Sequence, residues 1–168
     1  MSLSVKFEHR FPNLSVQIEF EAPTPGVTAL FGPSGCGKST VVMAVAGLLK
    51  PDNCRIDIDG TVLVDTKSNV WCPPETRRIG LVFQDARLFP HMSVLRNLNF
   101  GARRAPSGPI RFDDVVNLLG IEHLLNRRPY SFSGGERQRV AIGRALLAQV
   151  GSISPCSRSK ARKLSSPP

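Results

Sequence analysis

The feature that most constrains the fold of this chain is a glycine-rich loop between a short apolar run and a helical stretch. The loop reads Gly32-Pro33-Ser34-Gly35-Cys36-Gly37-Lys38-Ser39-Thr40, and it follows the strand-forming run 26–31. Residues 38–50 favour a helix, which Pro51 cannot continue. Strand, glycine loop and helix in this order let backbone N–H groups surround phosphate oxygens. The sequence therefore predicts an α/β fold built around a nucleotide phosphate site.

Each part of this loop has an expected chemical role. Gly37 opens a helix whose positive dipole end faces the bound anion. Lys38 is expected to reach the β- and γ-phosphates, and Ser39 is expected to ligate Mg²⁺. Cys36 is interpreted as variable loop filler rather than as a redox sensor. The predicted nucleotide contacts are Gly32, Pro33, Ser34, Gly35, Cys36, Gly37, Lys38, Ser39 and Thr40. The alternative is a chance glycine-rich turn, and the complete pattern after a strand argues against it.

The other secondary structure follows from residue periodicity. Alternating apolar residues predict strands at 3–7 and 14–20, and Asp59-Gly60 predicts a hairpin over 55–64. A buried strand is expected at 79–83. Helices are expected over 113–127, with a break at Gly120, and over 136–149. The inward face of the last helix is expected to hold Val140, Ala141, Ile142, Ala145, Leu146 and Leu147.

Charge and composition separate a mildly basic domain from a basic tail. The formal net charge is +9, and all 13 acidic residues lie at or before Glu136. Residues 150–168 are rich in Ser, Pro, Lys and Arg, so they are expected to be disordered. A nucleic-acid or anionic-lipid partner is the alternative explanation of the charge. No apolar run approaches 18 residues and no secretory signal is recognised, so neither a membrane span nor export is expected.

A second anion-binding surface is predicted near residue 133. Ser133-Gly134-Gly135 places a hydroxyl and bare amides at the start of a basic helix. A plain helix cap is an equally simple explanation of these residues taken alone. Between the two motifs, Gln84 ends the predicted strand 79–83, where its amide could contact Mg²⁺ or an attacking water. A surface glutamine is the simpler interpretation of that residue by itself.

Together, the loop, Gln84 and the Ser-Gly-Gly motif resemble the Walker A loop, Q-loop and signature of the ATP-binding cassette (ABC) ATPases. The resemblance covers residues 3–149, with Phe132 and Glu136 in place of the usual Leu and Gln of the signature. Within this family the chain is most similar to the ATPase subunits of molybdate importers. That similarity rests on residues 26–32, 73–80, 83–91 and 118–125. Sulfate, polyamine and ferric-iron importers carry near relatives of these motifs.

The resemblance implies a P-loop ATPase domain over residues 1–149, with an N-terminal antiparallel β subdomain and a helical subdomain over about 85–135. It implies an ATPase that couples ATP binding and hydrolysis to uptake of an oxyanion, most simply molybdate, with ATP and Mg²⁺ as cofactors. Ser39 and Gln84 would contact Mg²⁺. Phe11 would stack on adenine, and a core position is the alternative for Phe11.

The resemblance also implies partners and a location. Two copies would form composite ATP sites, in which Ser133, Gly134, Gly135 and Glu136 contact ATP held by the other copy. A membrane permease would dock near Phe89, Pro90 and His91, and an external binding protein would act through the permease. No nucleic-acid partner is implied, because the coiled-coil heptads of the chromosome-maintenance relatives are missing. The implied location is the cytoplasmic face of the cell membrane, as a peripheral subunit.

The pattern departs from the family after Gln149. The family continues with an apolar strand and an Asp-Glu pair, whereas Cys156 and Ser157 stand at about those positions here. Neither side chain can hold Mg²⁺ or orient water as a carboxylate does, so no catalytic carboxylate is expected to be retained. We therefore expect a core that is incomplete at the C-terminus, with residues 150–168 as an out-of-frame ending. The alternative function is a truncated remnant that binds ATP at most.

Overall fold

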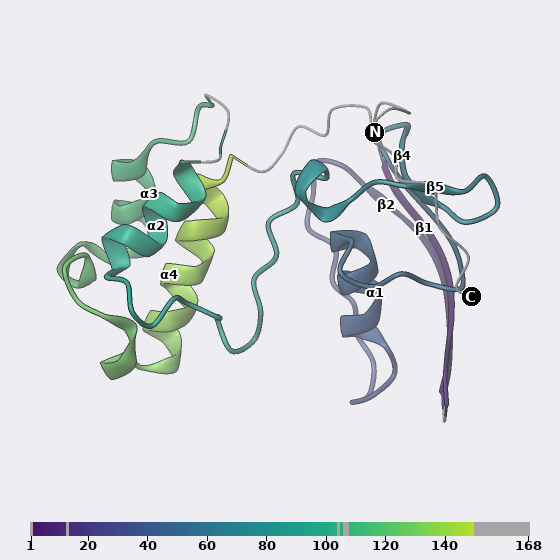
Figure 1. The fold of residues 1–168 in the computed structure, drawn as a ribbon, viewed down its shortest axis with the longest axis horizontal. Helices are drawn as coiled ribbons and strands as arrows, with labels where there is room; N and C mark the ends of the chain where they lie inside the picture. Colours follow the sequence, from purple (N-terminus) through teal and green to yellow (C-terminus); the bar gives the residue numbers. More distant parts are fainter. Residues whose placement is uncertain (1, 13, 104, 106–107, 150–168) are drawn as a thin grey trace. The chain divides into compact units, whose positions relative to one another are not determined.

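A computed structural model describes residues 2–12, 14–103, 105 and 108–149. The described residues form two compact units, at 2–78 and 79–149 (Figure 1). The expectations for residues 150–168, a disordered tail and an out-of-frame ending, lie outside the described residues.

The first unit is built on a five-stranded antiparallel sheet with the order β2-β1-β3-β4-β5. The strands are β1 (Ser2–Phe11), β2 (Leu14–Pro23), β3 (Asn53–Ile58), β4 (Thr61–Asp65) and β5 (Val70–Trp71) (Figure 1). The pair β1–β2 runs from Ser2 opposite Pro23 to Phe11 opposite Leu14. The two predicted N-terminal strands and the hairpin are confirmed. Asp59 and Gly60 form its turn with φ of 51° and 79°, as a favoured tight turn requires.

Helix α1 (Lys38–Ala46) belongs to the same unit and ends earlier than predicted. The prediction of a helix through Lys50 was wrong because Gly47 adopts a left-handed conformation, with φ of 82°, and closes the helix. Beyond Gly47 the chain turns toward β3.

A buried arginine fixes the end of α1. Arg77 is fully buried, and its Nη1 donates to the carbonyls of Ala44 and Val45 at 2.8 Å each. Its Nε donates to the Cys72 carbonyl at 2.7 Å. A Cβ at Gly47 would lie 2.8 Å from Arg77 Nε, so only glycine leaves room for the guanidinium. Burial lowers the pKa of Arg77 to about 10, which leaves it charged at neutral pH as a counterion for the helix C-terminus.

The predicted strands at 26–31 and 79–83 do not form. Within the described part of the chain, every strand pair is antiparallel and none involves either segment. A strand of a parallel core sheet takes its hydrogen bonds from its neighbours, so apolar composition alone cannot produce one. The relative exposure of Val27 is 102% and that of Phe31 is 91%, so these two side chains have almost no cover among the described residues.

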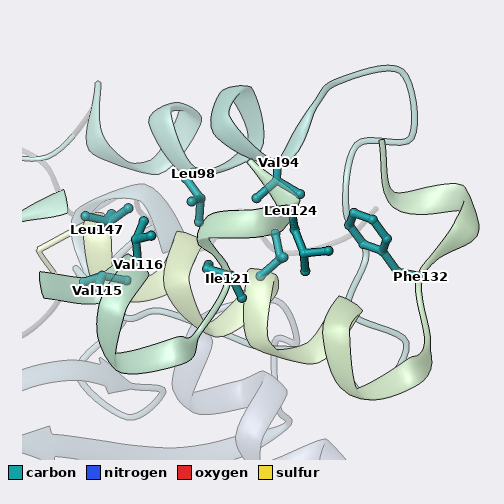
Figure 2. Close-up of a cluster of buried hydrophobic side chains, with 9 residues drawn as sticks. Val94, Leu98, Val115, Val116, Ile121, Leu124, Phe132 and Leu147 are labelled. Carbon is teal, nitrogen blue, oxygen red and sulfur yellow. The ribbon is translucent and has the colours of Figure 1, made fainter. Parts of the chain in front are cut away.

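The second unit is helical. Its helices are α2 (Val94–Ala102), α3 (Phe112–Leu119) and α4 (Gly134–Leu147), with 3-10 turns at Glu122–Leu124 and Pro129–Ser131. They enclose one apolar cluster (Figure 2). Its buried members are Val94, Leu98, Val115, Val116, Ile121, Leu124, Phe132, Val140 and Leu147. Figure 2 shows Phe132 at one end of this cluster and Leu147 at the other.

The predicted helices of this unit are confirmed with two adjustments. Gly120 ends α3 with φ of 60°, but a 3-10 turn follows it rather than a second α-helix. On α4, three of the predicted inward residues are buried: Val140, Ala141 and Leu147. The others, Ile142, Ala145 and Leu146, are half-buried. The α/β class with an antiparallel β subdomain and a helical subdomain is confirmed. No helix within the described ranges is long and apolar enough to cross a membrane.

Candidate nucleotide-binding site

The phosphate loop leads into a helix start that no side chain caps. Gly35 and Gly37 have φ of 83° and 95°, so the loop uses conformations that favour glycine. Helix α1 has no side-chain hydrogen bond at its cap and no acidic residue in its first turn. The partial positive charge of its first amides is therefore not offset by these side chains. Such a helix start fits a phosphate group.

Lys38 folds back into this loop. Its Nζ donates to the carbonyls of Gly32 and Pro33, at 2.8 Å each, and lies 3.6 Å from Cys36 Sγ. Lys38 takes part in none of the ion pairs found within residues 2–12, 14–103, 105 and 108–149. The ammonium thus has carbonyl dipoles but no carboxylate to balance it. The next residues, Ser39 and Thr40, occupy the first turn of α1, and Ser39 is exposed. This donor set fits a triphosphate with Mg²⁺.

Gly37 is required by packing as well as by conformation. A Cβ at this position would lie 2.7 Å from Cγ1 and 2.9 Å from Cγ2 of Val16, on β2. The start of α1 therefore lies directly against the sheet.

Replacement of Gly37 with alanine is expected to destabilise the N-terminal unit by about 2 to 4 kcal/mol, from left-handed strain plus overpacking. Fluorescence of Trp71, the single tryptophan, would follow the unfolding of this unit in urea. The matched control is Gly60→Ala, where φ is 79° but no atom lies within 4 Å of the added methyl. The free energy of unfolding of the control should fall by about 1 kcal/mol, from left-handed strain alone. An equal fall in the free energy of unfolding of the two variants would show that the contact with Val16 does not contribute to stability.

The start of α4 carries a complete capping box. Ser133 Oγ accepts from the Glu136 amide at 3.2 Å, and a Glu136 carboxylate oxygen accepts from the Ser133 amide at 2.7 Å and from its hydroxyl at 2.8 Å. These hydrogen bonds, first from the hydroxyl and then from the amide, lower the pKa of the Glu136 carboxyl. The acidic residue at the variant signature position thus holds Ser133 in place.

Phe132, at the other variant position of the signature, packs inside the helical unit. It is buried in the apolar cluster, and its carbonyl accepts from Arg137 Nη1 at 2.7 Å. The Arg127 guanidinium lies 5.6 Å from its ring centroid. An apolar anchor at this position fixes the loop that precedes Ser133.

Nothing among the described residues requires glycine at the next two positions. A Cβ at Gly134 would meet no atom within 4 Å, and one at Gly135 would meet only Arg139 Nη1 at 3.8 Å. Neither residue has a positive φ. Alanine favours a helix by about 1 kcal/mol over glycine, so these glycines weaken the helix start without an internal benefit. They leave bare, exposed backbone at the N-terminus of α4.

Gln84 lies in a turn and not at a strand end. Its side chain is exposed, in the segment where the predicted strand 79–83 does not form. Phe89 is half-buried, with its ring centroid 4.6 Å from that of Phe100, while Pro90 and His91 are exposed. A cavity of about 370 Å³ is lined by Met92, Arg96, Asn99, Phe100 and Arg103.

Asn97, which was not predicted from the sequence, organises this segment. The side chain is fully buried, and its Nδ2 donates to the carbonyls of Phe89, Met92 and Ser93 at 3.2, 3.2 and 3.0 Å. Its Oδ1 accepts from the Phe89 amide at 2.9 Å. A polar residue between Val94 and Leu98 on an apolar helix face was the available signal. Asn97 fixes the turn that carries the predicted docking residues Phe89, Pro90 and His91.

Phe11 ends β1 with 37% relative exposure, and its ring packs edge-on against His9 with centroids 4.6 Å apart. The core alternative for Phe11 therefore does not hold. Phe11 and the phosphate loop lie in the first unit. Gln84 and residues 133–136 lie in the second.

Comparison with known proteins identifies the family of these motifs. The family described as ABC transporter matches residues 16–151. The molybdenum import ATP-binding protein ModC of Granulibacter bethesdensis is 53% identical over 156 residues, which cover 88% of this chain and 40% of that protein. The ModC protein of Pectobacterium atrosepticum is 54% identical, over 86% of this chain and 41% of that protein. The chain thus spans about 40% of the length of these relatives.

Two solved structures share the fold. An ATP-binding cassette solved as a dimer in a post-hydrolysis state, with ADP and phosphate, is 26% identical with a TM-score of 0.68. The match covers 89% of this chain and 70% of that one. The protein cbiO1 of Clostridium perfringens, part of the cbiONQ ABC transporter complex, is 30% identical with a TM-score of 0.67. That match covers 88% of this chain and 61% of the other.

Proposed function

The chain belongs to the ABC transporter family, and from this premise we propose that it is the ATP-binding subunit of an importer, in which ATP binding and hydrolysis drive uptake of molybdate. The observation that carries this proposal is the uncompensated positive charge of the phosphate loop, where Lys38 and the start of α1 have no acidic partner among the described residues. The molybdate substrate is supported by the similarity to proteins named for molybdenum import. Sulfate, polyamine and ferric iron are the alternative substrates.

The proposed contacts serve three parts of the ligand: the phosphates, the Mg²⁺ ion and the adenine ring. The backbone N–H groups of residues 34–37 and the start of α1 would face the β- and γ-phosphates, and Lys38 would donate to their oxygens. Ser39 and Gln84 would hold Mg²⁺, which would supply positive charge to offset that of the phosphates. Phe11 offers an exposed ring for stacking on adenine.

We place the second half of each ATP site on another copy of the chain. The exposed amides of Gly134 and Gly135 and the Ser133 hydroxyl would approach a γ-phosphate, with Glu136 holding the serine. No described residue requires glycine at these two positions, and close approach of an external group would explain them. The dimeric state of the solved relative supports the same arrangement.

The proposed membrane partner is a permease, which docks near Phe89, Pro90 and His91. Exposed Pro90 and His91 on a turn fixed by Asn97 are suited to rigid docking. An external binding protein would act through that permease, and the chain would work at the cytoplasmic face of the membrane. The alternative function is a chain that binds ATP without hydrolysing it, which is supported by Cys156 and Ser157 at the positions of the family's Asp-Glu pair.

The variant Gly135→Ala tests the proposed composite site. The added methyl is expected to weaken MgATP-dependent self-association at least tenfold, because it separates the backbone from the γ-phosphate. The same change should leave the unfolding midpoint unchanged or raise it, since alanine favours the helix by about 1 kcal/mol. Sedimentation velocity with and without MgATP gives the association constant. Asn117→Ala, an exposed change on α3, is the control. Equal MgATP-dependent association in both variants would contradict the assignment.

A further inference from the structure

Arg144 joins two segments that the proposed function needs. It lies on α4, and its Nη2 donates to the carbonyl of Arg87 at 3.0 Å and to that of Ala86 at 3.4 Å. Its guanidinium also lies 5.2 Å from the centroid of the Phe89 ring. Burial lowers its pKa. The side chain therefore connects the helix that starts at the signature with the segment that follows Gln84.

The backbone at this contact adopts a rare conformation. Ala86 and Arg87 have φ of 59° and 43°, in the left-handed region that non-glycine residues avoid. Each such residue costs about 1 to 3 kcal/mol and persists only where its surroundings hold it. The two carbonyls that Arg144 binds belong to these two residues. Arg144 is thus placed to maintain the bend between Gln84 and Phe89.

The downstream side of this bend is held by several contacts. Downstream, Phe89 is held by Asn97 and by the Phe100 ring, both on α2. Helices α2 and α4 themselves meet at Gly101, where a Cβ would collide with the Arg144 carbonyl. The segment from Gln84 to Phe89 therefore has one fixed end on α2 and a central anchor on α4. Gln84 itself is exposed, so its position depends on the bend that follows it.

We propose that Arg144 is a positioning residue that holds the Gln84–Phe89 segment on α4, the helix that begins after Ser133. Nucleotide binding would then change the mobility of Gln84, of the turn that carries Phe89, Pro90 and His91, and of Ser133 together. This inference rests on the proposed function, because it gives Gln84 a nucleotide to respond to. Arg144 itself touches no nucleotide in this scheme. It acts through the two carbonyls and the Phe89 ring.

Hydrogen exchange on the full 168-residue chain tests the proposal. Without nucleotide, Arg144→Gln should speed exchange of amides 85–89 at least tenfold, while the amides of α2 and α3 stay within twofold. With MgATP, the wild-type chain should gain protection both at residues 32–40 and at residues 84–89. Arg144→Gln should keep the first protection, with the same nucleotide affinity, and lose the second. Arg144→Lys, which retains the charge and one donor group, should restore part of the MgATP-dependent protection at residues 84–89.

Arg139→Gln, an exposed change on the same helix, is the matched control and should behave as wild type. The inference is overturned if amides 84–89 are protected equally in wild type and Arg144→Gln, or if exchange rises uniformly across residues 79–149. It is also overturned if MgATP protects residues 32–40 of the wild type but never residues 84–89. Absence of MgATP-dependent protection at residues 32–40 in the wild type would instead contradict the proposed function. The comparison of wild type with Arg144→Gln without nucleotide would still test whether Arg144 holds the Gln84–Phe89 segment.

Discussion

Replacing Asn97 with alanine is expected to lower the free energy of unfolding of the helical unit by about 3 to 4 kcal/mol, because several buried backbone groups each lose a partner at about 1 to 3 kcal/mol. The side chain is fully buried and serves the Phe89 amide and three carbonyls at once. Alanine also leaves a cavity that water cannot readily fill with equivalent geometry. Asn97 is therefore expected to contribute strongly to the stability of this unit.

Urea unfolding followed by far-UV circular dichroism would measure this loss. Three of the four α-helices in the described residues lie in the helical unit, so the signal reports mainly on it. Asn117→Ala on α3 provides the control, because that side chain is exposed, and it should change stability by less than about 0.5 kcal/mol. A loss below 1 kcal/mol for Asn97→Ala would mean that the docking turn does not need this side chain.

Replacing Lys38 with alanine is expected to raise the dissociation constant for MgATP about a hundredfold. A hydrogen bond to a charged group contributes about 1.5 to 3 kcal/mol, and each 1.4 kcal/mol corresponds to a factor of ten. The stability of the chain should change little, because the bonds that Lys38 now makes to Gly32 and Pro33 are exposed. Isothermal titration with MgATP would give both affinities.

Lys67→Ala, which removes an exposed lysine from a turn of the same unit, is the matched control and should bind MgATP as the wild type does. Equal affinity of the Lys38 variant and the wild type would contradict the phosphate-loop assignment. The same proteins decide between the two proposed functions. Wild-type ATP turnover well above that of Lys38→Ala would exclude the non-hydrolysing alternative, and turnover equal to that of the variant would support it.

Local signals in the sequence predicted the parts of the fold that depend on local chemistry. Asp59-Gly60 indicated the hairpin turn, Gly120 indicated the end of α3, and both are confirmed. The helix cap that was weighed at Ser133 is present, and it is a full capping box with Glu136, which was not predicted. The roles proposed for the phosphate loop, Gln84 and Phe11 remain predictions, although the structure gives their conformation and exposure.

The failed strand predictions share one physical cause, which is that a short pattern carries no information about distant partners. The runs 26–31 and 79–83 have the composition of strands, but a strand also needs neighbours that complete its hydrogen bonds. Arg144 was missed for the same reason, since its acceptor at Ala86 is 58 residues away in the sequence. A charged residue on an otherwise ordinary helix shows its role only after the chain has folded.

The packing at the two ends of α1 has a consequence for ligand affinity. Gly37 presses the first turn against Val16, and Arg77 holds the carbonyls of the last turn. Contacts at both ends restrict tilting and sliding of the helix, so its first amides would need little rearrangement when an anion binds. Binding at such a preorganised site loses little conformational entropy, and more of the electrostatic attraction remains as affinity.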